Sequence, residues 1–414
     1  MKLVHAADLH LDSPLHGLVR YEGAPVERIR GSTRRALQNL VSLCLEQDAR
    51  LLLIAGDLYD GTWRDHSTAL FFTEQMARLR AVDCRVVWVR GNHDAQSRLT
   101  GHLRPGSHVL ELPHDRPGTE RFEELGIAVH GQGFSRADLT DDLLAAYPVP
   151  VGDLLNIGLL HTALTGRAGH ALYAPCSLER LVAQGYDYWA LGHVHQREEL
   201  CREPWVVFPG NLQGRHARET GPKGATVITV DGGRITEVRP VALDVMRWER
   251  AEVDVTLAKN LDDVLDAVSG RLDELSLRAD GRLCAVRVVL AGRSPMHTGL
   301  LREQSGLDLG VRELAHGVGE LWIERVKLAT EPPRDLDALA ERDDAVGGVL
   351  AALHRLREEP RALSELAELV APMTAKLPPE LRGLVLPSEP GALAELSRDV
   401  EQIVLSELLD GDGA

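Results

Sequence analysis

The stretch "LLLIAGDLYDG", Leu51 to Gly61, decides the fold class of this chain. An unbroken apolar run bounded by a glycine is typical of a strand buried on both faces, as in a parallel sheet covered by helices. Two carboxylates, Asp57 and Asp60, follow directly after this run. A carboxylate at the end of such a strand lies where the protected interior opens, so the position suits a ligand or a metal ion.

Strand-like apolar runs recur through the first half of the chain, at residues 3–7, 51–55, 86–89, 154–160, 189–191 and 206–208. Two segments between the first three runs, 32–47 and 67–82, carry apolar residues at helical spacing. This alternation of strands and helices predicts crossover units and a largely parallel sheet with helices on its faces. The predicted fold class is therefore α/β.

The chain of 414 residues is long enough for two or three domains. We predict a first domain over residues 1–244. Residues 245–330 contain the strand-like "AEVDVTL", the helix-like "NLDDVLDAVSGRL" and two further strands, which predicts a small α+β accessory domain. The segment "EPPRD" breaks this pattern. Residues 331–414 are predicted to be an acidic helical tail, with helical runs at 336–357, 361–370 and 393–409.

The composition sets limits on location and on partners. Five cysteines without a CxxC pair indicate neither a disulfide framework nor a zinc knuckle and favour the reducing cytoplasm. The N-terminal apolar stretch is broken by His5, Asp8 and His10, which argues against a signal peptide, and no run is long enough to cross a membrane. The net charge of −16 argues against nucleic acid without excluding it, because residues 334–414 alone carry 8 basic and 17 acidic residues.

Metal-capable side chains follow the predicted strands. They are Asp8 and His10 in "ADLH", Asp57 in "AGDLYDG", Asn92, His93 and Asp94 in "RGNHD", His161 in "GLLHT", and His193 and His195 in "LGHVH". The carboxyl ends of parallel strands meet at one edge of a sheet, so residues far apart in sequence can converge there. Other histidines, such as His5, His66, His108 and His130, have no partner motif, and surface or core roles are favoured for them.

This mixture of ligand types suits a pair of divalent cations. A bridging carboxylate can give one oxygen to each of two ions, and Asp57 is the candidate for that role. Imidazoles and an amide oxygen would fill the remaining positions. Mixed nitrogen and oxygen ligands favour manganese, iron or zinc over magnesium or calcium.

The motifs "DLH", "GDLYD", "GNHD", the isolated histidine after a strand and "GHVH" resemble, in order and spacing, the calcineurin-like metallophosphoesterases. Within that superfamily, "HAADLHLDSPL" and "PGNLQGRHARETGPKG" resemble bacterial DNA repair exonucleases of the SbcD type, and most of all the YhaO branch. The specific motifs cover residues 1 to about 245. The resemblance implies a four-layer α/β/β/α sandwich, to which a small α+β capping domain and the helical tail would be added.

The resemblance also implies roles for individual residues. One metal would be held by Asp8, His10, Asp57 and His195, and the second by Asp57, Asn92, His161 and His193. His93 would be a catalytic histidine that binds no metal and stabilises the transition state or protonates the leaving oxygen, while a metal-bound water attacks phosphorus. The implied function is that of a DNA exonuclease with Mn²⁺ as the preferred ion, Fe²⁺ and Zn²⁺ as alternatives, and an SbcC/YhaN-like ATPase as partner.

Four further residues receive weaker roles. Many relatives have a histidine where this chain has Asp60, and a carboxylate would repel phosphate, so we expect Asp60 to orient a neighbouring ligand or to bind backbone amides. Asp94 is expected to orient an imidazole. Arg215 and His216 lie in "QGRH", and a loop returning to the site could offer the arginine to a phosphate oxygen.

Two rival functions stay open at this stage. The same ligands serve phosphoesterases that act on nucleotides, cyclic nucleotides or phosphoproteins. A metal-bound scaffold without catalytic activity is the rival from a different class, and the complete ligand set with His93 argues against it. The leucines of the tail can dock a partner or pack on their own domain, and we favour docking. A homodimer is left open, and no membrane partner is expected.

Overall fold

The computed structural model describes residues 1–13, 24–60, 66–96, 106–164 and 173–332, together with 343–344, 347–351 and six single positions between 361 and 376. The helical runs predicted for the tail therefore lie almost entirely outside the described residues. Within the described part, no helix is both long and apolar enough to cross a membrane.

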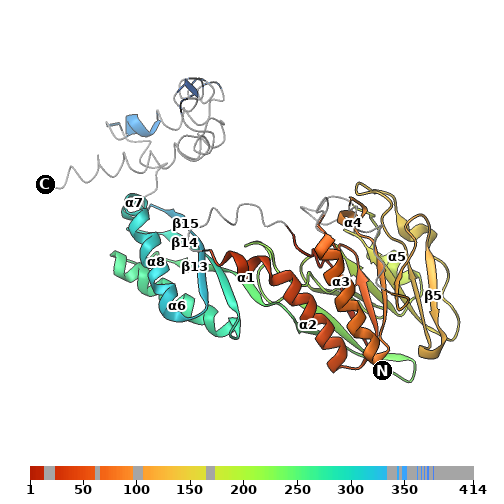
Figure 1. Cartoon of the computed structure of the whole chain (residues 1–414). Helices are drawn as coiled ribbons and strands as arrows, with labels where there is room; N and C mark the ends of the chain where they lie inside the picture. Colours follow the sequence, from red (N-terminus) through yellow and green to blue (C-terminus); the bar gives the residue numbers. More distant parts are fainter. Residues whose placement is uncertain are drawn as a thin grey trace. The chain divides into compact units, whose positions relative to one another are not determined.

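Residues 2–242 form two six-stranded sheets (Figure 1). The first sheet has the order β12-β11-β1-β2-β3-β4, and its members are β1 Lys2–Ala6, β2 Ala49–Ala55, β3 Arg85–Val89, β4 Val109–Glu111, β11 Gly224–Asp231 and β12 Arg234–Ala242. The second has the order β5-β6-β7-β8-β10-β9, with β5 Gly118–Phe122, β6 Ile127–Gly131, β7 Leu155–His161, β8 Tyr188–Gly192, β9 Glu198–Arg202 and β10 Trp205–Phe208. Strands β1 to β4 are parallel, as are β6, β7, β8 and β10. The predicted α/β class is confirmed.

The run that decided the fold class is buried on both faces, as predicted. Leu51, Leu53 and Ala55 of β2 pack into a core between the two sheets, where they share a cluster with residues of β7 and β8. Leu52 and Ile54 point the other way and pack with residues of α2 Ser32–Glu46 and α3 His66–Arg78. This alternation follows from the two-residue period of a strand.

Helices cover the outer face of each sheet. Figure 1 shows α2 and α3 side by side on the first sheet, and 3₁₀-helix η2 Leu79–Val82 continues α3. On the second sheet, Leu181 of α5 Leu178–Ala183 and Leu143 of 3₁₀-helix η5 Leu143–Ala146 pack with Trp189 of β8. The order helix, sheet, sheet, helix confirms the predicted four-layer sandwich. The remaining short helices here are α1 Val26–Arg30, α4 Asn92–Gln96 and 3₁₀-helix η4 Glu123–Leu125.

A third sheet has the order β13-β14-β15, formed by Met246–Asp254, Leu283–Arg293 and Leu321–Glu331. The segments between these strands form α6 Leu261–Ala279, α7 His297–Arg302 and α8 Gln304–Val318. Sequence analysis identified the three strands and α6 but missed α7 and α8. Glycines at 306, 310 and 317 obscure the helical pattern of α8, because glycine disfavours helix.

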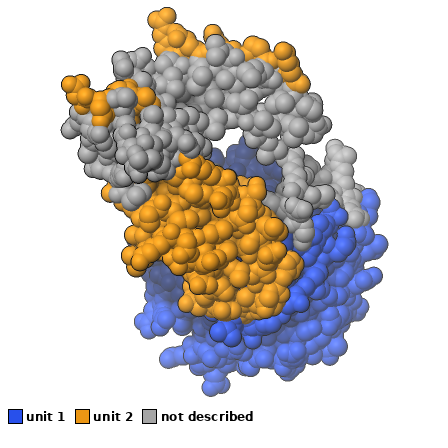
Figure 2. All heavy atoms as spheres, turned by 90° about the vertical axis from the view of Figure 1, so that its left-hand side faces the viewer, with its two compact units in different colours: residues 1–249, 277–286, 320–324 blue, residues 250–276, 287–319, 325–414 orange. Residues whose placement is uncertain are grey.

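The chain divides into two compact units (Figure 2). Unit 1 comprises residues 1–249, 277–286 and 320–324, and unit 2 comprises 250–276, 287–319 and 325–414. The first residues of β14 and β15 therefore belong to unit 1. There, Leu283 and Trp322 pack in a cluster with Trp248 and Ile29.

The two sheets come close together where β2 and β8 end. A Cβ atom added at Gly192, the last residue of β8, would lie 1.8 Å from the carbonyl oxygen of Ala55, the last residue of β2. No real Cβ contact is that short, so only glycine fits. This close approach brings the ends of strands from both sheets to one place.

Gly192→Ala is expected to lower the free energy of unfolding by about 1 to 3 kcal/mol, because the added methyl group must push two sheet ends apart. Urea denaturation of the purified variant measures this loss. Gly152→Ala is the matched control: a Cβ there meets no atom within 4 Å, and the change should stay within about 0.5 kcal/mol. Equal stability of the two variants would contradict the close approach.

Candidate metal centre

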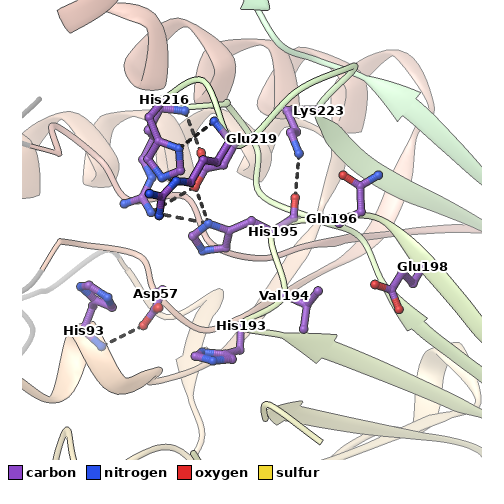
Figure 3. A pocket seen from close by; sticks show the side chains of 12 residues that line it. Asp57, His93, His193, Val194, His195, Gln196, Glu198, His216, Glu219 and Lys223 are labelled. Carbon is purple, nitrogen blue, oxygen red and sulfur yellow. Dashed lines mark hydrogen bonds and ion pairs between the residues drawn. The ribbon is translucent and has the colours of Figure 1, made fainter. Parts of the chain in front are cut away.

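Five strand ends place the predicted ligands around one site. Asp8 and His10 follow β1, Asp57 follows β2, and Asn92 follows β3. His161 is the last residue of β7, and His193 and His195 follow β8. Seven candidate ligands thus come from both sheets, and Figure 3 shows Asp57, His93, His193 and His195 around the pocket.

Four of these ligands adopt backbone angles that non-glycine residues rarely use. The φ angle is +52° at Asp8, +42° at His10, +51° at Asp57 and +99° at His193. Such conformations cost of the order of 1 kcal/mol or more each, and they cluster at functional sites. Backbone hydrogen bonds hold two of the turns together: the amide of Asp8 donates to Gly56 O, and that of His10 to Asp57 O, both at 3.0 Å.

Asp8, His10 and His195 form one compact set of side chains. The Nε2 atoms of His10 and His195 lie 3.3 Å apart, and Nε2 of His195 lies 4.0 Å from Oδ1 of Asp8. Burial, with the nearby charge of Arg215, lowers the pKa of His10 to about 3, so its imidazole is neutral. Burial and the proximity of Asp57 raise the pKa of Asp8.

Asp8, Asp57 and His161 form a second set, to which Asn92 adds an amide oxygen. Nδ1 of His161 lies 2.9 Å from Ala55 O, which can only accept a hydrogen bond, so Nδ1 carries the hydrogen. Burial lowers the pKa of His161 to about 3, and Nε2 of the neutral ring therefore carries a lone pair. This lone pair faces Asn92 Oδ1 at 3.0 Å and Asp57 Oδ2 at 3.5 Å. Three electron-pair donors that face one another fit a cation between them.

Asp8 is common to both sets, and Asp57 belongs to the second set but also lies close to His10 of the first. The Oδ2 atom of Asp57 is 3.5 Å from Nε2 of His161 and 3.8 Å from Nε2 of His10. Its Oδ1 atom instead accepts a hydrogen bond of 2.9 Å from the amide of His93. Oδ2 is therefore the oxygen of Asp57 that faces imidazoles of both sets, while Oδ1 is held by the backbone.

His193 contributes to the site in two ways. Its backbone amide donates to both carboxylate oxygens of Asp8, at 3.0 and 3.2 Å. Its ring packs edge-on against that of His161, with centroids 5.2 Å apart. The imidazole is thus beside the second set, where the predicted second metal would bind, although it belongs to neither compact set.

His93 differs from the predicted ligands in exposure and in partner. Its side chain is 39% exposed, whereas those of His10 and His161 are fully buried. Nδ1 of His93 lies 2.8 Å from Oδ1 of Asp60, and this hydrogen bond raises the pKa of the imidazole. The contact orients the ring, and Nε2 has no hydrogen bond within the described part of the chain. An imidazole at the open edge of a metal centre can donate a proton or a hydrogen bond to a ligand.

Asp60 thus orients His93, whereas the sequence led us to expect that it orients a metal ligand or binds backbone amides. Its Oδ2 atom also accepts a hydrogen bond of 2.5 Å from the hydroxyl of Ser13 and lies 3.7 Å from Nη1 of Arg215. Its Oδ1 atom lies 3.6 Å from Nδ1 of His10, whereas Asp57 faces Nε2 of the same ring. The two carboxylates therefore lie on opposite sides of that imidazole.

Asp60→Asn is expected to reduce phosphoester hydrolysis about ten- to hundredfold, since the amide removes the charge that orients His93 and raises the pKa of its imidazole. The turnover rate with a chromogenic phosphodiester at saturating Mn²⁺ measures this loss of activity. Affinity for Mn²⁺ should stay within about threefold of that of the unaltered chain. A large loss of affinity would instead make Asp60 a ligand, since it also forms a compact set with His10 and His93.

Asp94 has contacts that the sequence did not indicate. Its carboxylate accepts hydrogen bonds from the amides of Leu58 and Gly91, at 3.1 and 3.0 Å, and of Tyr59 at 2.9 Å. These bonds tie the loop after β2 to the loop after β3. Asp94 therefore fixes the position of Asp57 relative to Asn92 through the backbone.

Glu219 is a site residue that sequence analysis missed. Its Oε1 atom lies 2.6 Å from Nδ1 of His195 and 3.4 Å from Nη2 of Arg215 (Figure 3). In the motif "RHARE", Glu219 is four residues after Arg215, and this spacing could have indicated their ion pair. Nothing in the sequence indicates the contact with His195, which depends on the fold. His216 is exposed and lies 3.4 Å from the same oxygen.

A cavity of about 520 Å³ opens beside the metal centre. It is lined by Asp57, His93, His193, Val194, His195, Gln196, Glu198, Arg215, His216, Arg218, Glu219 and Lys223. Lys223 is buried and donates a hydrogen bond of 2.9 Å to the carbonyl of His195. Both predicted substrate residues, Arg215 and His216, thus line the same cavity as His93.

Comparisons with known proteins agree with this site. Residues 1–197 match the family model of calcineurin-like phosphoesterases, and residues 248–331 match that of the middle domain of metallophosphoesterase YhaO. The chain is 35% identical over 303 residues to an uncharacterized metallophosphoesterase, YhaO of Bacillus subtilis (strain 168), covering 71% of this chain and 72% of that protein. It is 26% identical over 419 residues to the DNA double-strand break repair protein Mre11 of Methanopyrus kandleri, covering 92% and 84%.

A crystal structure of a dimetal phosphatase from Danio rerio is similar at 14% identity and a TM-score of 0.36, covering 59% of this chain and 99% of that one. This likeness is too weak to carry a structural argument.

The chain therefore belongs to the calcineurin-like metallophosphoesterases, hydrolases that depend on divalent metal ions. Within that superfamily, the match over residues 248–331 and the identity to YhaO place it in the YhaO branch. The resemblance seen in the sequence motifs is thereby confirmed.

Proposed function

We propose that this protein is a phosphodiesterase that uses two Mn²⁺ ions and acts as a DNA exonuclease in DNA repair. The observation that carries the two-metal part is the position of Asp57 Oδ2, within 4 Å of the Nε2 atom of His161 and of His10, one imidazole from each ligand set. A carboxylate oxygen close to imidazoles of both sets is what a shared ligand requires.

Each residue then has a defined task. When bound, the two ions would supply a nucleophile at neutral pH and neutralise the charge that develops at phosphorus. Asp8, His10 and His195 would hold one ion, and Asn92, His161 and His193 the other, with Asp57 shared. His93 lies at the exposed edge and uses Nδ1 for Asp60, so its Nε2 atom is positioned to give a proton or a hydrogen bond to the leaving oxygen. Asp60 holds His93 in that orientation.

The choice of DNA as substrate is supported by similarity. The alignment with the archaeal repair protein Mre11 covers 92% of this chain, and so extends well beyond the ligand motifs of residues 1–197. The cavity beside the metal centre is lined by Arg215 and Arg218, whose guanidinium groups suit phosphate oxygens. A phosphodiester backbone offers such oxygens on both sides of the scissile bond.

The test uses the full chain stripped of metal by a chelator. Mn²⁺ is added back, and end-labelled DNA is incubated beside a small chromogenic phosphodiester. Release of labelled nucleotides from DNA is the expected result. Cleavage of the small ester alone would favour a phosphoesterase for nucleotides or phosphoproteins. Metal uptake without cleavage of either substrate would favour a scaffold.

We also propose an SbcC/YhaN-like ATPase as partner, docked by the tail at residues 331–414. The support is the leucine-rich, acidic sequence of that tail and the resemblance of the sequence motifs in the first domain. A chain truncated before Pro332 should keep its phosphodiesterase activity and lose its binding to the ATPase in gel filtration. ATPase binding that survives the truncation would remove the tail from this role.

A further inference from the structure

Two imidazoles of the metal centre have different partners at Nδ1. Nδ1 of His195 lies 2.6 Å from the carboxylate of Glu219, whereas Nδ1 of His161 lies 2.9 Å from the neutral carbonyl of Ala55. Both contacts fix the hydrogen on Nδ1 and leave Nε2 for a cation. A carboxylate partner makes an imidazole a stronger electron-pair donor than a carbonyl does.

Glu219 is held firmly in this position. Its carboxylate is 7% exposed, and its Oε2 atom accepts hydrogen bonds of 2.9 Å from Asn211 Nδ2 and 2.7 Å from the amide of Arg215. Its Oε1 atom faces Nδ1 of His195 and lies 3.4 Å from Nη2 of Arg215, so hydrogen-bond donors surround the carboxylate. The carboxylate cannot turn away from the imidazole without losing these bonds.

We infer that Glu219 is a positioning residue that makes the subsite of Asp8, His10 and His195 the tighter of the two metal subsites. The inference rests on the two-metal centre of the proposed function and is independent of DNA as the substrate.

A purely structural role for Glu219 makes a different prediction. The bonds to Asn211 and Arg215 also shape the loop, so removal of the carboxylate could loosen the segment as a whole. A loosened loop would disturb any ligand that depends on it and lower the stability of the metal-free chain. If Glu219 acts through His195 alone, its removal should instead weaken the binding of one metal ion and leave the binding of the other unchanged.

The test is a titration of the chelator-stripped full chain with Mn²⁺, monitored by calorimetry and by electron paramagnetic resonance. The unaltered chain should bind two ions in two steps, with an isolated-ion spectrum after the first and a spin-coupled spectrum after the second. In Glu219→Gln, the first step should weaken about ten- to hundredfold, and the second should change by less than about threefold.

Two control variants separate charge and loop effects. Glu199→Gln removes a carboxylate from β9 that pairs with Arg197 and Arg202. Gln213→Ala removes hydrogen bonds between the same loop and residues 245 and 246. Both should leave the first step within about threefold of that of the unaltered chain.

Three results would overturn the inference: an unchanged first step in Glu219→Gln, equal weakening of both steps, or a loss in Gln213→Ala as large as in Glu219→Gln. These differ from failure of the proposed function. If the unaltered chain took up no Mn²⁺, or only one ion, the two-metal centre itself would be wrong.

Discussion

Asp57→Asn is expected to abolish paired metal binding and to reduce phosphodiester hydrolysis by about three orders of magnitude or more, equivalent to roughly 4 kcal/mol of transition-state stabilisation. The side-chain oxygen of the asparagine can still accept the bond from the amide of His93. The NH₂ group then replaces Oδ2 and points toward Nε2 of His10 and of His161. Hydrogen-bond donors would then occupy the place of an oxygen that a cation needs, and one of them would bond to the lone pair on Nε2 of His161.

The same change should not destabilise the metal-free protein. Asp8 and Asp57 are both buried, and their proximity contributes to the raised pKa of Asp8, so removal of one charge relieves repulsion. We expect the melting temperature of the chelator-stripped variant to equal or exceed that of the unaltered chain. The rise on addition of Mn²⁺ should disappear, because a ligand stabilises only a fold that binds it.

Asp83→Asn is the matched control for this variant. Asp83 has a φ angle of +53°, close to that of Asp57, but it is exposed and pairs with Arg50. The Asp83→Asn variant should retain both metal binding and activity, since an exposed ion pair contributes little to stability. If Asp57→Asn kept two tightly bound Mn²⁺ ions, Asp57 would not be the shared ligand.

His93→Ala is expected to retain both metal ions and to lose hydrolysis by a factor of about 10² to 10⁴. The geometry separates these two effects: the His93 ring contacts Asp60, whereas the amide that bonds Asp57 belongs to the backbone and survives the substitution. Steady-state kinetics with a chromogenic phosphodiester give the loss in kcat. The Mn²⁺ titration described for Glu219 gives the affinity.

The exposed histidine at the start of α3 provides the comparison, and His66→Ala should match the unaltered chain in both measurements. A loss of Mn²⁺ from His93→Ala that equals its loss of activity would mean that His93 is a ligand. A rate unchanged by the substitution would mean that leaving-group assistance comes from another residue.

Much of the fold was predictable because it depends on local pattern. The run from Leu51 to Ala55 is apolar on both faces of a strand, so burial between two layers is its only favourable environment. The motifs after β1, β2, β3, β7 and β8 follow from the same pattern, since ligands gather where parallel strands end. Helix α8 was missed because its glycines weaken the periodic signal while tertiary packing stabilises the helix.

The sequence by itself determined the α/β class, the order of the ligand motifs and the family. Only the tertiary structure decided how these residues act on one another: Asp60 on His93, Asp94 on three backbone amides, and Glu219 on His195. The physical reason is distance. A strand imposes its period of two on neighbours within a few residues, whereas a hydrogen bond between Glu219 and His195 depends on how two chain segments 24 residues apart meet in space.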